Sequence, residues 1–520
     1  MAIDSKAMTK RVTASFRRVQ PALAFAAAHS DSDLSLPMLT KLTEKMNGRP
    51  PFPLVQGDAT RLPFATSALW SWDSVLYARA LELGYRQGID IAEQRPQAPG
   101  YVFYVALASL VRQLTHDSNS ALVAVSIVAS GLAAATAYLV ARRFARSGAA
   151  CAGALGLGLS PIAWTFGETA VPYELLALGS ISIAGAFHAS RGRPDRTIAA
   201  SLLWGLAAGF RQDLLVILGP LWLWTIAPVA WRDRAIAAGS VAAGCLFWLV
   251  PSALGSGGLD GYVAALAAQA GRVETMSPIA SGAPQLVSNL SLSAYGLFWG
   301  SLAVGLVMLV RGLARLAAVG RSPNATFFAL WIVPALVFYT FVHTGDPAYV
   351  LSVLPAIFVA FAAWLDAIGA GRPWAIALGT VVAVAQGAFF IVTGPYGLSA
   401  EALAAHDRSV HELVAVTTAT PARGSVVVAQ SGYLTAIYYA RDRPVRYSGA
   451  TPEVLDRSVR AEPPPSVRTT VIVFGGGVKL DGVIPTSLSA TGSIQLFVVD
   501  AGISYPIPLY DLEVEPASIP

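Results

Sequence analysis

Long runs of apolar residues dominate the chain between about Ser120 and Gly394. Each run has roughly twenty residues, and a helix of about that length crosses the hydrocarbon core of a bilayer. Only 13% of the 520 residues are charged, whereas 54% are hydrophobic, and a water-soluble core cannot bury that much apolar surface. The sequence therefore predicts an α-helical, polytopic membrane protein.

About ten or eleven transmembrane helices follow from these runs. The candidate spans are 120–141, 149–167, 171–189, 197–210, 213–230, 234–254, 291–311, 325–343, 347–364 and 373–394. The apolar segment 99–114 is short for a crossing, and we expect it to form an interfacial helix on the outer leaflet.

Arginines lie in alternate connections between these spans. Positively charged loops stay in the cytoplasm, so the sequence predicts that these connections are cytoplasmic. They hold Arg142, Arg143, Arg146, Arg191, Arg193, Arg196, Arg232, Arg234, Arg311, Arg315, Arg321 and Arg372. The net charge of +5 then reflects topology, and without aromatic residues interleaved on a polar face it does not indicate a nucleic-acid partner.

Three segments divide the chain. Residues 1–60 are expected to be an atypical, poorly ordered segment, because 34–60 is too polar and proline-rich to span a membrane. Residues 61–394 form the predicted transmembrane domain. Residues 395–520 are predicted to form a small extracytoplasmic α/β domain, with a helix at 401–416 and strands at 426–430, 469–476 and 494–500.

The first outer segment places Asp73 between aromatic residues, just before a helical pattern that continues through Tyr77. Asp73 could cap that helix within an aromatic belt, or it could be the acid of a site at the membrane interface. In the next segment Arg95 lies in a proline-rich turn. It could bind a lipid phosphate, or its side chain could simply extend from the apolar surface toward the interface.

Further charged residues collect in the predicted outer connections. Glu168 lies in a short loop, whereas Arg211 and Asp213 interrupt apolar sequence, and such charges usually face a cavity or pair with one another. His343 and Asp346 stand at the outer ends of two spans, with no metal-ligand spacing around them. The parity of the spans puts all these groups on the face that holds Asp73, which suits a site that opens outward.

The order of these segments resembles the GT-C class of glycosyltransferases, the relatives of protein mannosyltransferases and aminoarabinose transferases that use polyprenyl-phosphate sugars. The resemblance rests on WSWDSVLYARAL (70–81), QRPQAPGYVFYVAL (94–107), FGETAVPYELL (166–176) and GDPAYVLSVLPAIF (345–358). Asp73 matches the catalytic acid of the first outer loop, and Glu168 matches the acid of the second. Membership would imply a multi-pass enzyme of the bacterial inner membrane.

The resemblance implies inverting transfer of a sugar from a polyprenyl-phosphate donor to a glycan, lipid or protein acceptor, with Asp73 as general base. Arg211 and Arg95 are the expected phosphate-binding residues. The expected substrate-binding residues are Tyr77, Asp213, His343, Asp346 and Tyr349. Membrane lipid is an expected partner, no cofactor is certain, and a divalent cation could be held by the acidic residues.

Two other functions fit a polytopic chain of this kind. A transporter or flippase would line a solute path with the intramembrane charges, but such proteins usually show repeated halves and broken helices near the midplane. A membrane scaffold that binds polyprenyl lipids without catalysis is the third possibility.

Overall fold

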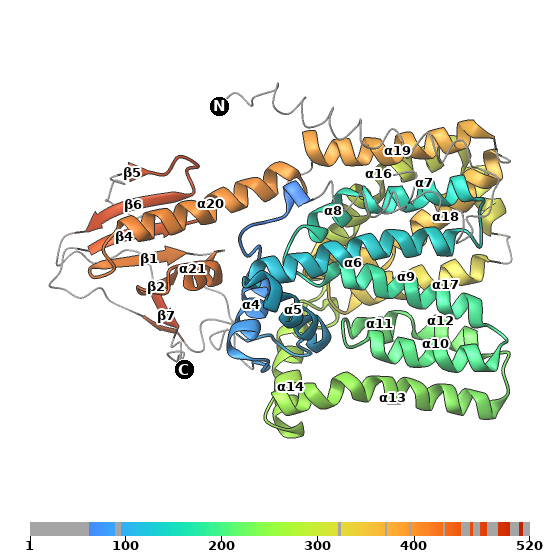
Figure 1. Ribbon diagram of the computed structural model, residues 1–520, viewed down its shortest axis with the longest axis horizontal. Coiled ribbons are helices and arrows are strands. Elements are labelled where there is room, and N and C mark those ends of the chain that lie inside the picture. The colour runs from blue at the N-terminus through green and yellow to red at the C-terminus, as the bar shows by residue number, and fades with distance from the viewer. Residues whose placement is uncertain are drawn as a thin grey trace.

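The computed structural model describes residues 62–88, 95–320, 324–369, 372–394, 397–429, 432–448, 458–460, 469–475, 487–499 and 509–512. The N-terminal segment predicted at 1–60 lies outside these residues. The described part consists of a helical bundle and, beyond one end of it, a sheet (Figure 1).

Most helices of the bundle run side by side along its long axis, whereas α4 and α5 lie at the end nearest the sheet (Figure 1). The elements are η1 (Leu62–Phe64), α4 (Trp72–Leu83), α5 (Val102–Thr115), α6 (Ser118–Ala141), α7 (Ser147–Gly158), α8 (Pro161–Gly167), α9 (Tyr173–Ser190), α10 (Pro194–Ala207), α11 (Asp213–Ile217), α12 (Gly219–Ile226), α13 (Trp231–Gly255), α14 (Leu259–Thr275), α15 (Pro278–Ser281), α16 (Ala283–Gly320), α17 (Ala325–Phe341), η3 (Pro347–Ser352), α18 (Leu354–Gly369) and α19 (Pro373–Val392).

Three described helices, α6, α13 and α19, are long and apolar enough to cross a membrane, and α7 with α8 would add a fourth if that bent pair forms one span. Their outward faces are apolar, since Leu139, Phe247 and Val381 are each more than 60% exposed. Apolar faces of this extent are rare on proteins surrounded by water, so the bundle belongs in a bilayer. The total number of crossings stays a prediction.

Prolines divide three of the predicted spans. The span at 149–167 bends by 57° between α7 and α8, where Pro161 begins the second helix. The span at 213–230 forms α11 and α12, with Pro220 in the first turn of α12. The span at 347–364 forms the 3-10 helix η3 and α18, with Pro355 as the second residue of α18. Proline lacks the amide donor and clashes with the preceding turn, so a continuous helix is interrupted at these points.

Helices α10 and α13 cross at a reciprocal pair of glycines. A Cβ atom on Gly205 would lie 2.3 Å from the carbonyl oxygen of Val241, and one on Gly244 would lie 2.7 Å from the carbonyl oxygen of Leu202. The two backbones touch at this point because neither residue has a side chain. Small residues are the usual means by which membrane helices approach this closely.

The described C-terminal strands form a seven-stranded sheet in the order β3-β7-β2-β1-β4-β6-β5. β1 pairs in parallel with β2 and β4, and the other pairs are antiparallel. The strands predicted at 426–430, 469–476 and 494–500 fall on β1, β4 and β6. The strands are β1 (Ser425–Ala429), β2 (Val445–Ser448), β3 (Ser458–Arg460), β4 (Thr469–Phe474), β5 (Ser487–Leu488), β6 (Ile494–Val499) and β7 (Leu509–Leu512).

Helix α20 (Ala400–Ala419) runs from the end of the bundle across the sheet, and α21 (Tyr433–Tyr439) lies beside β1 and β2 (Figure 1). The helix predicted at 401–416 corresponds to α20. One apolar cluster runs from Leu76 of α4 through Leu434 of α21 to Val427 of β1, and all three side chains are almost fully buried. The end of the bundle that holds α4 therefore shares a core with the C-terminal part.

Candidate active site

A cavity of about 470 Å³ lies at the end of the bundle that faces the sheet. Its walls come from α4, the turn before α5, the start of α9, α14 and the loop that enters η3. Aromatic side chains supply much of the lining, and two carboxyl groups and one guanidinium face the same space. They are Trp70, Trp72, Tyr77, Tyr101, Phe166, Tyr173, Tyr349, Asp73, Asp346 and Arg272.

Asp73 lies in the first turn of α4, but it does not cap that helix. The cap is Ser71, whose hydroxyl accepts from the Ser74 amide while the Ser74 hydroxyl accepts from the Ser71 amide. This capping box leaves the Asp73 carboxylate exposed to the cavity. Desolvation by the enclosing protein raises the pKa of Asp73, and the charge of Arg211 opposes that shift. A carboxylate with a raised pKa is a better proton acceptor at neutral pH.

Asp346 is the second carboxyl group of the cavity. One of its oxygens caps η3 by accepting from the Ala348 amide at 2.8 Å. Burial and the negative charge of Asp73 raise the pKa of Asp346 to about 7, although the Ala348 amide and Arg211 act in the opposite direction. The loop also holds His343, whose ring lies 5.7 Å from that of Tyr349, and burial lowers the pKa of His343.

Arg211 lies behind an aromatic wall of the cavity. Its guanidinium carbon is 4.8 Å from the ring centroid of Tyr101, 5.1 Å from that of Tyr173 and 5.3 Å from that of Tyr349. Its Nη2 contacts Oδ2 of Asp213 at 2.6 Å. Three tyrosines of the lining thus share one buried cation, which fixes the orientation of the rings.

The structure brings most of the predicted site residues together. Asp73, Tyr77, His343, Asp346 and Tyr349 line the cavity. The other four are outside its described lining: Arg211 and Asp213 are behind the tyrosines, Glu168 is the buried C-terminal cap of α8, and Arg95 donates to the Gly84 carbonyl at 2.8 Å.

Arg272 and Gln269 line the cavity, and the sequence interpretation missed both. They belong to α14, within residues 255–290, which connect the predicted spans 234–254 and 291–311 and for which the sequence predicted no element. Arg272 Nη1 donates to Gln269 Oε1 at 3.2 Å. The signal that could have found Arg272 is the helical pattern from Leu259 onward, which ends in an arginine beside an outward-facing site.

Among the described residues, no group of three or more histidine, cysteine, aspartate or glutamate side chains could hold a metal ion. Asp73 and Asp346 are the two carboxyl groups in the lining, and the charge of Arg211 acts on both.

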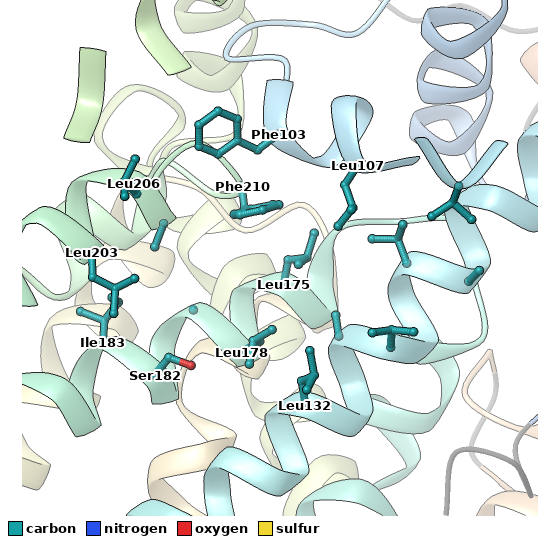
Figure 2. Close-up of a pocket in the computed structure, with 17 residues that line it drawn as sticks. Phe103, Leu107, Leu132, Leu175, Leu178, Ser182, Ile183, Leu203, Leu206 and Phe210 are labelled. Carbon is teal, nitrogen blue, oxygen red and sulfur yellow. The ribbon is translucent and has the colours of Figure 1, made fainter. Parts of the chain in front are cut away.

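A second cavity, of about 730 Å³, has an almost wholly apolar lining from α5, α6, α9 and α10. Figure 2 shows Phe103, Leu107, Leu132, Leu178 and Leu203 around this common space. Residues that line the two cavities are close together in the sequence. Tyr101 of the first stands two residues before Phe103 of the second, and the Phe103 ring lies 5.4 Å from that of Phe210, which precedes Arg211.

The fold has counterparts among solved structures. ArnT from Cupriavidus metallidurans bound to undecaprenyl phosphate matches with a TM-score of 0.54 at 12% identity, over 86% of this chain and 96% of that one. The apo form of the same ArnT matches with a TM-score of 0.53 at 14% identity, over 86% and 97%. This chain has the fold of ArnT. The GT-C fold that the sequence resemblance implies is therefore confirmed.

The archaeal oligosaccharyltransferase AglB from Archaeoglobus fulgidus matches with a TM-score of 0.40 at 12% identity, over 75% of this chain and 63% of that one. By sequence, no family model and no curated protein matches the chain.

Proposed function

We propose that the protein is a glycosyltransferase that moves a sugar from a polyprenyl-phosphate donor to an acceptor on the extracytoplasmic face of the membrane. The observation that supports this most is the Asp73 carboxylate, which is left free by the Ser71 cap and faces a cavity of about 470 Å³. That volume is within the range of small-molecule sites, roughly 300–1,000 Å³. The fold shared with ArnT, which was solved with undecaprenyl phosphate, agrees with a lipid-phosphate donor.

In the proposed reaction Asp73 accepts the proton of an acceptor hydroxyl. The oxygen then attacks the anomeric carbon from the side opposite the phosphate, a new glycosidic bond forms, and the bond from the anomeric carbon to the phosphate oxygen breaks. Polyprenyl phosphate leaves with the bonding electron pair as an anion, so no strong general acid is needed. The configuration at the anomeric carbon inverts, and positioned bases of this kind contribute about 10²- to 10⁴-fold in rate.

The donor phosphate needs a cation at the cavity surface. Arg272 faces the cavity and is our candidate for that contact. Arg211, one of the two arginines expected from the sequence, would act through the field that it creates behind Tyr101, Tyr173 and Tyr349. Arg95 would instead stabilise the turn at Gly84.

The apolar cavity between α5, α6, α9 and α10 would hold the polyprenyl chain of the donor (Figure 2). Its lining offers no charged side chain, which suits an isoprenoid and excludes a sugar. Tyr101 and Phe103 would then separate the part of the donor that reacts from the part that anchors it.

The test is transfer of radiolabelled sugar from a panel of polyprenyl-phosphate sugars by membranes that contain the native chain, the Asp73→Asn form or the Asp260→Asn form. Asp260 is an exposed acid at the start of α14 and does not line the cavity, so its variant is the matched control. We expect transfer by the native chain and the control, and a loss of at least about 100-fold with Asp73→Asn. Equal transfer by all three would refute the role of Asp73, and no transfer from any donor would refute the proposed activity.

A further inference from the structure

The segment just before Asp73 has no regular secondary structure, although it places a residue of the proposed site. Residues 65–70 are neither helix nor strand. On one side Thr66 is bound to the bundle: its amide and hydroxyl donate to the Glu168 carbonyl at 2.9 and 3.0 Å, and its own carbonyl accepts from Asn119 Nδ2 at 2.7 Å. The next three residues turn their amides away from the bundle.

Side chains of α20 and α21 accept hydrogen bonds from all three of those amides. The Asp407 carboxylate accepts from the amide of Ser67 at 2.8 Å and from that of Ala68 at 3.1 Å, and it also accepts from the Ser67 hydroxyl at 2.8 Å. The Tyr439 hydroxyl accepts from the amide of Leu69 at 3.0 Å. Charge-assisted bonds of this kind are about twice as strong as neutral ones, so Asp407 is the main anchor.

Two further contacts extend this anchor to the cavity itself. His406 Nε2 lies 2.9 Å from the Leu69 carbonyl, and the ring of His406 lies 4.8 Å from that of Trp70, which lines the cavity.

The other end of α4 is bound to the same part of the chain. Glu82, in the last turn of α4, accepts from Arg441 Nη2 at 3.0 Å and from the Tyr438 hydroxyl. Arg441 also covers the Tyr438 ring, with its guanidinium carbon 4.3 Å from the centroid. α4 is thus attached at both ends to residues more than 330 positions away in the sequence.

We propose that α20, α21 and Arg441, just after α21, position the proposed base. Asp407 and Tyr439 hold the segment that enters α4, Arg441 and Tyr438 hold Glu82 at the end of α4, and together these contacts fix where the Asp73 carboxylate lies in the cavity. This inference rests on the proposed role of Asp73. Asp407 does not line the cavity and does not contact Asp73, so it is a positioning residue. A displacement of about 1 Å at a reacting group costs about 100-fold in rate, which makes such an anchor consequential.

The test compares Asp407→Asn with Glu401→Gln. Glu401 is on the same helix, and its side chain forms an exposed pair with Arg408 at 2.6 Å and not with the segment before α4, so it is the matched control. For Asp407→Asn we expect kcat to fall roughly 10- to 100-fold while the donor KM changes by less than about twofold. In an Asp73→Asn background the same substitution should cause no further loss, because both residues act through one group. An equal loss in both backgrounds, or a kcat like that of the control, would overturn the proposal.

Tyr439→Phe removes a single hydroxyl and supplies a second variant if Asp407→Asn does not fold; it should lower kcat in the same direction and by less. Amide hydrogen exchange at residues 67–69 requires no sugar donor. Exchange in this segment should be faster in Asp407→Asn than in Glu401→Gln. In Tyr439→Phe the exchange of the Leu69 amide should be faster than in Glu401→Gln. If the native chain transfers no sugar, the proposed function fails while the exchange result still decides whether α20 and α21 anchor this segment. Unchanged exchange would overturn the anchor.

Discussion

Arg211 and Asp213 make two side-by-side contacts behind the aromatic wall of the polar cavity, from Nη2 to Oδ2 at 2.6 Å and from Nε to Oδ1 at 3.3 Å. The Arg211 side chain is 2% exposed and that of Asp213 is 12% exposed. Tyr339 donates its hydroxyl to the same Asp213 oxygen at 3.0 Å. Among the described residues, Asp213 is the one carboxylate that forms an ion pair with Arg211. Removing it would leave a buried cation without its counter-charge.

We predict that Asp213→Leu lowers the free energy of unfolding by about 3–5 kcal/mol, the cost of breaking a buried pair on one side. Thermal unfolding of the purified protein in lipid nanodiscs measures this. Asp366→Asn is the control, because its partner Arg146, at 3.0 Å, is 51% exposed and the pair should contribute at most about 1 kcal/mol. A double substitution, Arg211→Met with Asp213→Leu, should be less harmful than Asp213→Leu alone; a larger loss would show that the pair does more than neutralise charge.

Asp346 predicts a dependence of stability on pH. Its pKa is about 7 in the folded chain, against an ordinary value of 3.8, so between these two pH values the folded state binds the proton and the unfolded state does not. The contribution of Asp346 to the free energy of unfolding is therefore greatest below about pH 4, falls as pH rises to about 7, and is constant above that. Asp346→Asn removes the ionisation, so the unfolding temperature of the variant relative to that of the native chain should rise from pH 5 to pH 8. A difference that is constant with pH would contradict the prediction.

The sequence predicted the fold where an element is set by its own residues. The apolar runs of α6, α13 and α19 are continuous, and each prediction matches a helix. The predicted spans that form two helices instead of one contain prolines. Whether Pro161 or Pro220 bends a helix or ends it depends on how the neighbouring helices pack, and the sequence does not show that packing.

The site was predictable in part for the same reason. Span parity placed Asp73 and Asp346 on one face, and the structure puts both in one cavity. The capping of α4 was ambiguous because Ser71 and Asp73 are both good caps, and only the backbone geometry selects the serine. Asp407 had no local signal at all, since its partners are about 340 residues earlier in the chain.

Arg272 provides a test of which cation meets the donor. We predict that Arg272→Gln raises the donor KM by about 10- to 100-fold, because loss of a charge-assisted contact to phosphate costs roughly 1.5–3 kcal/mol. Arg272→Lys should recover part of that loss by keeping the charge. Initial-rate measurements over a range of donor concentrations give both values.

Arg95→Gln is the comparison for Arg272, because the sequence pointed to Arg95 as a phosphate-binding residue whereas its Nη1 donates to the Gly84 carbonyl. We expect the donor KM of Arg95→Gln to change by less than about twofold, within the scatter of a surface substitution. A large increase with Arg95→Gln and none with Arg272→Gln would reverse the assignment.

Filling the apolar cavity should separate long-chain donors from short-chain ones. Val128 lies in its lining and is 58% exposed, so a larger side chain can enter the cavity from its open side without disturbing the core. We predict that Val128→Trp raises the KM for a donor with a long isoprenoid chain and leaves that for a two-isoprene donor nearly unchanged, since each CH₂ kept from its binding surface costs up to about 0.8 kcal/mol. Val381→Trp, which adds the same bulk to the exposed face of α19 outside this cavity, is the control. If Val128→Trp raises both KM values equally, the cavity is not where the chain binds; if it raises neither, the chain lies elsewhere on the bundle.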